Sequence, residues 1–201
     1  MRHRIFIAIN FPEEIKKELS SFQEKWPELP CRWVKKENLH ITLAFLGYLT
    51  DEELPEVIKI TKEITQRHEP FSINLNKICY GPPKKPPRMI WVEGEKSKDL
   101  ANLQIDLEKS LISSGKIKFE PEERSFTSHI TLGRIKQWEF KQIEPEERPE
   151  VNEDINLSFE VNSIEVMESE LKRGGAEYMV LESALLMTTG QIDYLTNGRI
   201  K

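Results

Sequence analysis

A tetrapeptide that occurs twice places chemically active side chains at a fixed spacing. The run 40–43, His-Ile-Thr-Leu, returns 89 residues later as 129–132. Ile and Thr favour β-strands, and strand side chains alternate between faces, so the His and Thr of each copy share one face while Ile and Leu share the other. The His and Thr Cα atoms are then roughly 6.5–7 Å apart, so an imidazole and a hydroxyl can reach one tetrahedral anion.

The duplication itself decides between two interpretations of the motif. A single His-x-Thr on a strand is usually structural, because threonine is a strand former and histidine tolerates a half-buried edge. Two identical copies in 201 residues indicate two related halves, each contributing one copy to a shared site. Histidine titrates near neutrality, so one imidazole can take a proton while its partner donates one.

Composition and charge limit the class of protein. A chain of 201 residues with 38% hydrophobic and 31% charged residues can form one globular domain or two small fused lobes. Its formal charge of −5 excludes a generally basic nucleic-acid coat, so RNA contact would need a local basic patch. Cys31 and Cys79 match no metal-ligand spacing and suit packing positions in a reducing cytoplasm. The apolar run 5–9 is too short for a signal peptide, and no stretch could span a bilayer.

Hydrophobic periodicity predicts strands and helices that interleave along the chain. We expect strands at 5–11, 39–46, 71–75, 89–93, 126–135, 155–168 and 178–186, a short extended piece at 32–35, and helices at 12–26, 50–66 and 97–115. Thr50 and Glu53 have the spacing of a capping box, Ser97 is a helix cap, Gly47 should end the first motif strand, and Gly174-Gly175 should form a hairpin turn.

This order of elements predicts an α+β fold with two antiparallel-rich sheets and helices on the outside. We expect a single domain over residues 1–186, made of two lobes that carry one motif each. The charged stretch 136–153 is expected to be a surface excursion, and residues 187–201 a polar C-terminal tail. The protein is expected to be a monomer that does not bind membranes.

The motifs resemble those of the two-histidine phosphoesterase superfamily, and within it the RNA 2′,3′-cyclic phosphodiesterases, historically named 2′-5′ RNA ligases. Residues 38–47 match the first motif of that family and residues 124–134 the second. Residues 4–8, 88–92 and 168–178 resemble its opening strand, mid-chain strand and closing hairpin, so the resemblance runs from about residue 2 to 186. Ser128 stands where the family usually has proline, which loosens the approach to the strand but removes no catalytic group.

The resemblance implies a bilobal, pseudo-twofold fold around a central cleft, and hydrolysis of an RNA 2′,3′-cyclic phosphate to a 2′-phosphate without metal or nucleotide cofactor. It assigns His40 as proton donor to the leaving 3′-oxygen and His129 as proton acceptor from water, although the near-symmetric motifs themselves do not distinguish the two. Thr42 and Thr131 would donate hydrogen bonds to the non-bridging oxygens. Arg134 would also bind the phosphate, but it lies five residues past His129 and therefore needs a bulge or the strand end to reach the same face.

Further RNA contacts are less marked in the sequence. The proline-rich loop 81–88 is either a solvated connection or a basic flap offered to a polyanion. An aromatic side chain near a motif strand either stacks a base or belongs to the core, and Arg124 is either structural or an RNA-backbone contact. The candidate contacts are Phe45, Lys84, Lys85, Arg88, Arg124 and Trp138. His3 and His68 have no motif around them and are expected to be surface residues.

Three functions remain open on the residues alone. The first is the cyclic phosphodiesterase acting on RNA that ends in a 2′,3′-cyclic phosphate, for which tRNA fragments are one candidate. The second is a ligase that runs the reverse reaction with a 5′-hydroxyl end, which the same groups could catalyse. The third is a non-catalytic module that binds RNA or nucleotide, for which two titrating imidazoles would be unnecessary. A metal site is disfavoured because no acidic or cysteine partner lies at ligand spacing near either motif.

Overall fold

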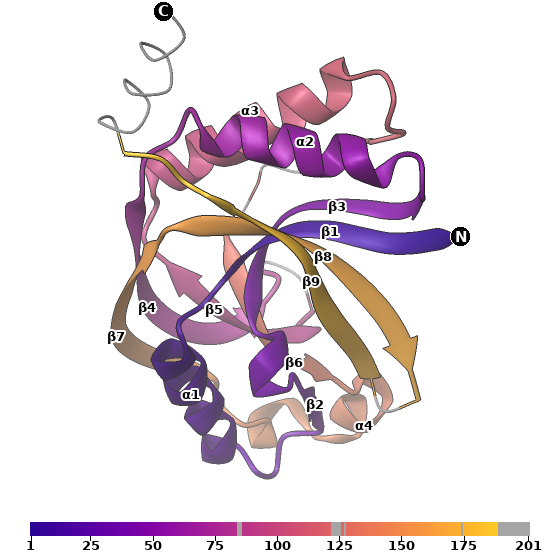
Figure 1. Ribbon diagram of the computed structural model, residues 1–201. Helices are drawn as coiled ribbons and strands as arrows, with labels where there is room; N and C mark the ends of the chain where they lie inside the picture. Colours follow the sequence, from indigo (N-terminus) through magenta and orange to yellow (C-terminus); the bar gives the residue numbers. More distant parts are fainter. Residues whose placement is uncertain (84–85, 122–125, 127, 174, 189–201) are drawn as a thin grey trace, which may run out of the picture.

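The computed structural model shows an α+β protein built on one large antiparallel sheet (Figure 1). It describes residues 1–83, 86–121, 126, 128–173 and 175–188. In these residues the sheet has nine strands: β1 (Arg2–Asn10), β2 (Cys31–Trp33), β3 (His40–Thr50), β4 (Phe71–Gly81), β5 (Met89–Gly94), β6 (His129–Ile135), β7 (Asn152–Val161), β8 (Ser163–Lys172) and β9 (Gly175–Leu185).

The sheet consists of two halves that meet at the motif strands. The strand order is β7-β4-β5-β6-β3-β1-β8-β9, with β2 added to β6. The strands β3 and β6 that carry the two motifs lie side by side at the centre, and a single residue pair, Ile41 with Ile130, joins them. Each motif strand is then flanked by further strands of its own half, as a pseudo-twofold relation requires. The α+β expectation is confirmed, and the two sheets expected from the sequence are the halves of one sheet joined at this narrow seam.

Both motif strands contain a bulge at the same position. In β3 the pairing with β1 skips Leu43, and in β6 the pairing with β5 skips Leu132. A bulge adds one residue to a strand and reverses the alternation of side chains beyond it. Phe45 and Arg134 are therefore returned to the face of the preceding His and Thr, which resolves the parity problem that Arg134 posed. Bulges also bend strands, which agrees with β3 and β6 pairing at only one residue pair before they diverge.

Several strand boundaries differ from expectation; β4, for example, runs to Gly81 and not to residue 75. The first motif strand does not end at Gly47 but continues to Thr50, with Gly47 at φ 72° next to a second register shift. The expected single strand 155–168 is two strands separated by Asn162, because β7 pairs with β4 while β8 pairs with β1 in the other half of the sheet. Both strands bury apolar residues, so the hydrophobic pattern runs through the break without marking it.

The two strands of the expected closing hairpin pair with each other. The strands β8 and β9 pair in antiparallel register from Ser163–Leu185 to Lys172–Gly175, as the expected hairpin requires. Gly174 of the expected turn and residues 189–201 of the expected tail lie outside the described residues.

The helices cover the sheet from two sides. α2 (Leu54–Thr65) and α3 (Lys98–Ser113) pack against each other on one side of the molecule, and α1 (Glu13–Ser21) and α4 (Gln137–Gln142) lie on the opposite side (Figure 1). The predicted cap of α3 is confirmed, since Ser97 Oγ accepts from Leu100 N at 3.2 Å. Thr50 and Glu53 form the two reciprocal bonds of the expected capping box, but Thr50 ends β3 and Glu53 is the N-cap of α2, so Thr50 is not the cap that we expected. The stretch 136–153 is more ordered than expected, because it forms α4. No helix in the described residues is long and apolar enough to cross a membrane.

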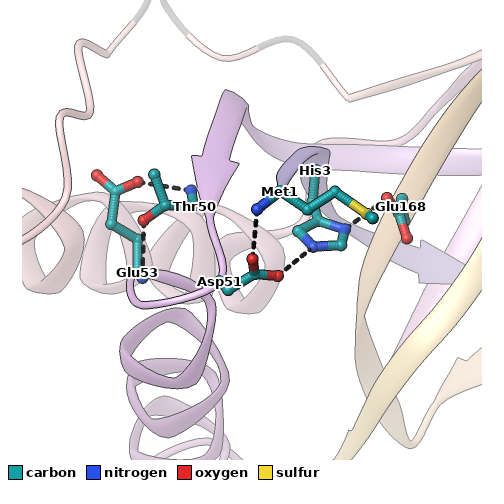
Figure 2. A network of polar contacts seen from close by, with 6 residues as sticks. All are labelled: Met1, His3, Thr50, Asp51, Glu53 and Glu168. Carbon is teal, nitrogen blue, oxygen red and sulfur yellow. Dashed lines mark hydrogen bonds and ion pairs between the residues drawn. The ribbon is translucent and has the colours of Figure 1, made fainter.

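His3 and His68, which we expected to be surface residues, are partly buried, and each contacts a carboxylate. The His3 ring lies between Asp51 Oδ1 and Glu168 Oε1, each at 2.8 Å, while the amino group of Met1 binds the other oxygen of Asp51 at 2.5 Å (Figure 2). Hydrogen bonds that the His3 ring donates to the carboxylate of Asp51 first, and then to that of Glu168, raise the pKa of His3 above its ordinary value. This cluster ties the start of β1 to β8. His68 Nε2 lies 3.1 Å from a carboxylate oxygen of Asp106.

Candidate active site

Both motifs open into one cavity of about 560 Å³, lined among others by His40, Thr42, His129, Thr131 and Arg134. The antiparallel register at the Ile41–Ile130 pair places His40 across from Thr131, and Thr42 across from His129. Ile41 and Ile130 are buried on the other face and anchor the arrangement to the core. The structure therefore brings together the five residues that the sequence analysis proposed for the phosphate site.

The imidazole of His40 is fixed by hydrogen bonds at both nitrogens. Nδ1 lies 2.8 Å from the carbonyl oxygen of Asn38, and since a carbonyl only accepts, Nδ1 carries the proton. In the neutral ring Nε2 is then an acceptor, and the hydroxyl of Thr42 donates a hydrogen bond to it at 3.0 Å. Asn38 is itself buried, and its side-chain amide donates to the carbonyl of Ala176 on β9 at 2.8 Å. The ring orientation thus depends on strands from two parts of the chain.

The surroundings of His40 disfavour its cationic form. Burial lowers the pKa of His40 to about 4, while the hydrogen bond to the Asn38 carbonyl acts in the opposite direction. The positive charges of Lys16 and Arg134 lower the pKa of His40 further, and a proton on His129 would do the same. His40 is therefore neutral at pH 7 in this arrangement.

His129 is held by a different kind of contact. Its ring stacks on the indole of Trp91, with centroids 3.9 Å apart and planes 24° from parallel. Trp91 lies on β5 between β6, which carries His129, and β4, which ends at Gly81. A Cβ at Gly81 would come within 2.2 Å of the indole, so the absence of a side chain there makes room for Trp91. The buried indole nitrogen has no hydrogen-bond partner among the described residues, so packing determines its position.

The cavity is strongly cationic although the chain as a whole is acidic. Of the described residues that line it, five are basic and none is aspartate or glutamate; the basic ones are Arg4, Arg32, Lys35, Arg134 and Lys172. A concave surface lined by one sign of charge concentrates anions of the opposite sign. Arg134 Nη1 lies 3.6 Å from the sulfur of Met89, and the hydroxyl of Thr131 lies 3.9 Å from the same sulfur. A thioether is a weak acceptor, so an anion in the cavity can replace it.

Of the other candidate RNA contacts that the structure describes, some line the cavity and some do not. Phe45 lines the cavity, whereas Trp138 is 76% exposed on α4, and neither Trp138 nor Arg88 lines it. Lys84, Lys85 and Arg124 lie outside the described residues. Among the residues that the structure describes, no group of three or more His, Cys, Asp or Glu side chains could hold a metal ion.

Sequence reasoning missed several residues that line the cavity. Arg4, Arg32 and Tyr178 line it from β1, β2 and β9, and Trp91 supports it from β5. Tyr178 lies in a segment that resembles the family, but no local pattern indicates that it or Arg32 faces the motifs. Arg4 lies just before the strand expected at 5–11, and no local pattern indicates which cavity it would line.

Comparison with known proteins shows the family to which the chain belongs. The family model described as LigT-like phosphoesterase matches residues 9–91. A protein of Methanocaldococcus jannaschii named RNA 2′,3′-cyclic phosphodiesterase is 33% identical over 180 residues, covering 89% of this chain and 98% of the relative. A protein of the same name from Thermotoga maritima is 31% identical over 183 residues, covering 89% and 92%. The chain belongs to the LigT-like phosphoesterase family.

Solved structures of this family share the fold. A protein from Thermus thermophilus superposes with a TM-score of 0.78 at 29% identity, covering 91% of this chain and 97% of that one. E. coli LigT in complex with 3′-AMP superposes with a TM-score of 0.75 at 26% identity, covering 94% and 100%. The LigT-like fold thus extends over nearly the whole chain, including both halves of the sheet.

Proposed function

We propose that this LigT-like phosphoesterase is an RNA 2′,3′-cyclic 3′-phosphodiesterase that hydrolyses a terminal 2′,3′-cyclic phosphate to a 2′-phosphate. The observation that carries the proposal is the meeting of two His-x-Thr motifs, from separate halves of the sheet, in one cationic cavity whose described lining contains no carboxylate. The names of the relatives from M. jannaschii and T. maritima support the same reaction. RNA with such an end is the proposed substrate, and a single chain supplies both motifs, which supports action as a monomer.

The reaction can be written with the groups that line the cavity. His129 takes a proton from a water molecule, whose oxygen attacks the phosphorus. The bond between phosphorus and the 3′-oxygen breaks, and His40 protonates that oxygen as it leaves. The hydroxyls of Thr42 and Thr131 and the guanidinium of Arg134 stabilise the negative charge on the non-bridging oxygens. One imidazole must therefore be neutral and the other cationic when the reaction starts.

His40 has to become protonated when the substrate binds. With a pKa of about 4, His40 lacks the proton that it is proposed to donate at pH 7. A phosphate anion beside the ring stabilises the imidazolium and raises its pKa. A phosphate oxygen would also attract the Thr42 hydroxyl away from Nε2, which leaves that nitrogen free to take up a proton and face the phosphate.

The titration of His40 is expected to move when phosphate binds. In the free protein its ring should titrate near pH 4, because its pKa is lowered to about 4, and saturating adenosine 2′-phosphate, a product of the proposed reaction, should raise the midpoint toward neutrality. NMR of imidazole-labelled protein measures this directly, with His68→Ala and His3→Ala variants to assign the signals. A midpoint that stays unchanged with ligand bound would contradict the donor role of His40 and favour an exchange of roles with His129.

The proposed activity is tested with a short RNA that ends in a 2′,3′-cyclic phosphate. We expect conversion to a 2′-phosphate end, unchanged by excess EDTA, and the product is identified by mass and by resistance to an enzyme that removes only 3′-phosphates. A 3′-phosphate product would contradict the proposed regiochemistry. Joining to an added 5′-hydroxyl RNA in preference to hydrolysis would support the ligase instead, and tight binding without turnover would support a binding module.

The cysteines support a location for this activity. Cys31 and Cys79 are unpaired in the structure, and both are partly buried. Burial raises the pKa of Cys31 to about 12 and that of Cys79 to about 11, which keeps both thiols protonated and unreactive. Unpaired, unreactive thiols fit a reducing compartment, and we propose that the enzyme acts in the cytoplasm.

A further inference from the structure

Arg4 lies in the same cavity as the motifs but some distance from them. It is on β1, whose alternate side chains Arg4, Phe6 and Ala8 share one face, and Ala8 pairs with Thr42 of the first motif. Arg4 is thus four residues along β1 from the strand position beside the phosphate site, roughly 13 Å between Cα atoms. Its side chain lines the same cavity as the motif residues.

The guanidinium of Arg4 is held in place without a charged partner. Its Nη1 donates to Ser169 Oγ at 3.1 Å, and its Cζ lies 4.8 Å from the ring centroid of Phe45. Within the described part of the chain no carboxylate forms an ion pair with Arg4, whereas Lys172, in the same cavity, is paired with Glu177 at 2.5 Å. A guanidinium oriented by neutral contacts keeps donors available for an anion, which arginine binds in a bidentate manner.

The pseudo-twofold relation between the halves indicates which kind of ligand Arg4 would bind. Phe45 follows His40 by five residues, as Arg134 follows His129, and the matching bulges place both on the cavity face. The second half thus has a cation beside its motif where the first half has an aromatic ring. That ring is 46% exposed, and the Arg4 cation packs on it. The cavity therefore has a cation near the motifs and another beyond Phe45, which suits a ligand with two separated anionic groups.

We propose that Arg4, oriented by Ser169 and Phe45, forms a second anion subsite that binds the phosphate on the 5′ side of the terminal nucleotide. The inference rests on the proposed function, because the reacting cyclic phosphate defines the first subsite. The ligand is either a terminal 5′-phosphate or the phosphodiester that joins the terminal nucleotide to the preceding one. A nucleoside 2′,3′-cyclic phosphate without any 5′ phosphate leaves this subsite empty and is a poorer substrate.

The test compares three substrates that share one reacting group: adenosine 2′,3′-cyclic phosphate, the same compound with a 5′-phosphate, and a dinucleotide with a 2′,3′-cyclic end. We expect the wild-type protein to prefer the second and third by roughly ten- to hundredfold in kcat/KM. Arg4→Met should remove that preference and leave the first substrate nearly unaffected. Arg4→Lys, which keeps the charge but loses the bidentate geometry, should restore part of it.

Arg2→Met is the matched control, because Arg2 lies on the same strand but does not line the cavity, and it should behave as wild type. Equal losses on all three substrates in Arg4→Met, or no wild-type preference, would overturn the subsite. A preference for the dinucleotide alone, abolished in Arg4→Met, would support it with the phosphodiester as ligand.

A binding measurement keeps the inference separate from the proposed reaction. Calorimetry should show that wild-type protein binds adenosine 2′,5′-bisphosphate more tightly than adenosine 2′-phosphate, and that Arg4→Met binds both equally. This difference depends on the subsite and not on turnover. It would therefore stand even if no substrate were hydrolysed, and its absence would overturn the subsite even if all three were.

Discussion

Replacing His40 or His129 with alanine is expected to lower kcat for a 2′,3′-cyclic RNA end by roughly 10²–10⁴-fold each. This is the usual size of a lost general acid or base, since each imidazole moves a proton in the same transition state. The double variant should be little slower than the worse single variant, because groups that act as a unit lose their effect together. Single-turnover kinetics on labelled RNA would measure these rates.

His68→Ala provides the matched control, because His68 is also partly buried and hydrogen-bonded but does not line the cavity. It should keep full activity, while thermal unfolding confirms that all variants are folded. A loss below tenfold in either motif variant would remove that histidine from the proposed mechanism. The wild-type rate should also depend on pH in a bell-shaped manner, because the acid and the base must hold opposite protonation states.

Replacing Thr42 and Thr131 with valine is expected to have the next largest effect. Valine keeps the shape of threonine but removes the hydroxyl proposed to bind a non-bridging oxygen, and removing one donor of this kind typically costs about 10²–10³-fold in kcat. The two positions should differ in one respect. Thr42 also donates to His40 Nε2, so Thr42→Val should shift the limb of the pH–rate profile that reports His40, whereas Thr131, which lies near the sulfur of Met89, should not.

Serine variants separate the hydroxyl from the rest of the side chain. Thr42→Ser and Thr131→Ser should retain activity within about tenfold of wild type. Thr61→Val is the control, because Thr61 is fully buried in α2, where its hydroxyl bonds to the carbonyl of Val57 away from the cavity. Serine variants as slow as the valine variants would show that the threonines act through packing and not through hydrogen bonds to phosphate.

The α+β class, most strand and helix positions, the Ser97 cap of α3 and the Thr50–Glu53 bonds could be predicted from the sequence. These features depend on local signals, such as apolar side chains at periods of two or 3.6 residues and the Thr50–Glu53 spacing. The division of 155–168 into β7 and β8 could not, because it depends on which half of the sheet each segment pairs with. Pairing partners lie far apart in the chain and have no local signature.

The candidate site divides in the same way. The two motifs could be identified from the sequence because the repeat itself is local. The sequence predicted that Arg134 reaches the phosphate only if the strand contains a bulge or ends before it. Whether a bulge forms depends on the neighbouring strand and not on the residues that form it. Arg4 could not be assigned to the cavity, because its partners Ser169 and Phe45 come from other strands.

The sequence by itself determined that two copies of one chemical motif would lie on strands, each with a histidine and a threonine on one face, because alternation along a strand is a property of the backbone. Only the tertiary structure decided that both copies face one cavity, that His40 is desolvated while His129 stacks on Trp91, and that the cavity is cationic in an acidic protein. Burial and charge at a point are sums over neighbours contributed by distant parts of the chain. They exist only once the strands are paired.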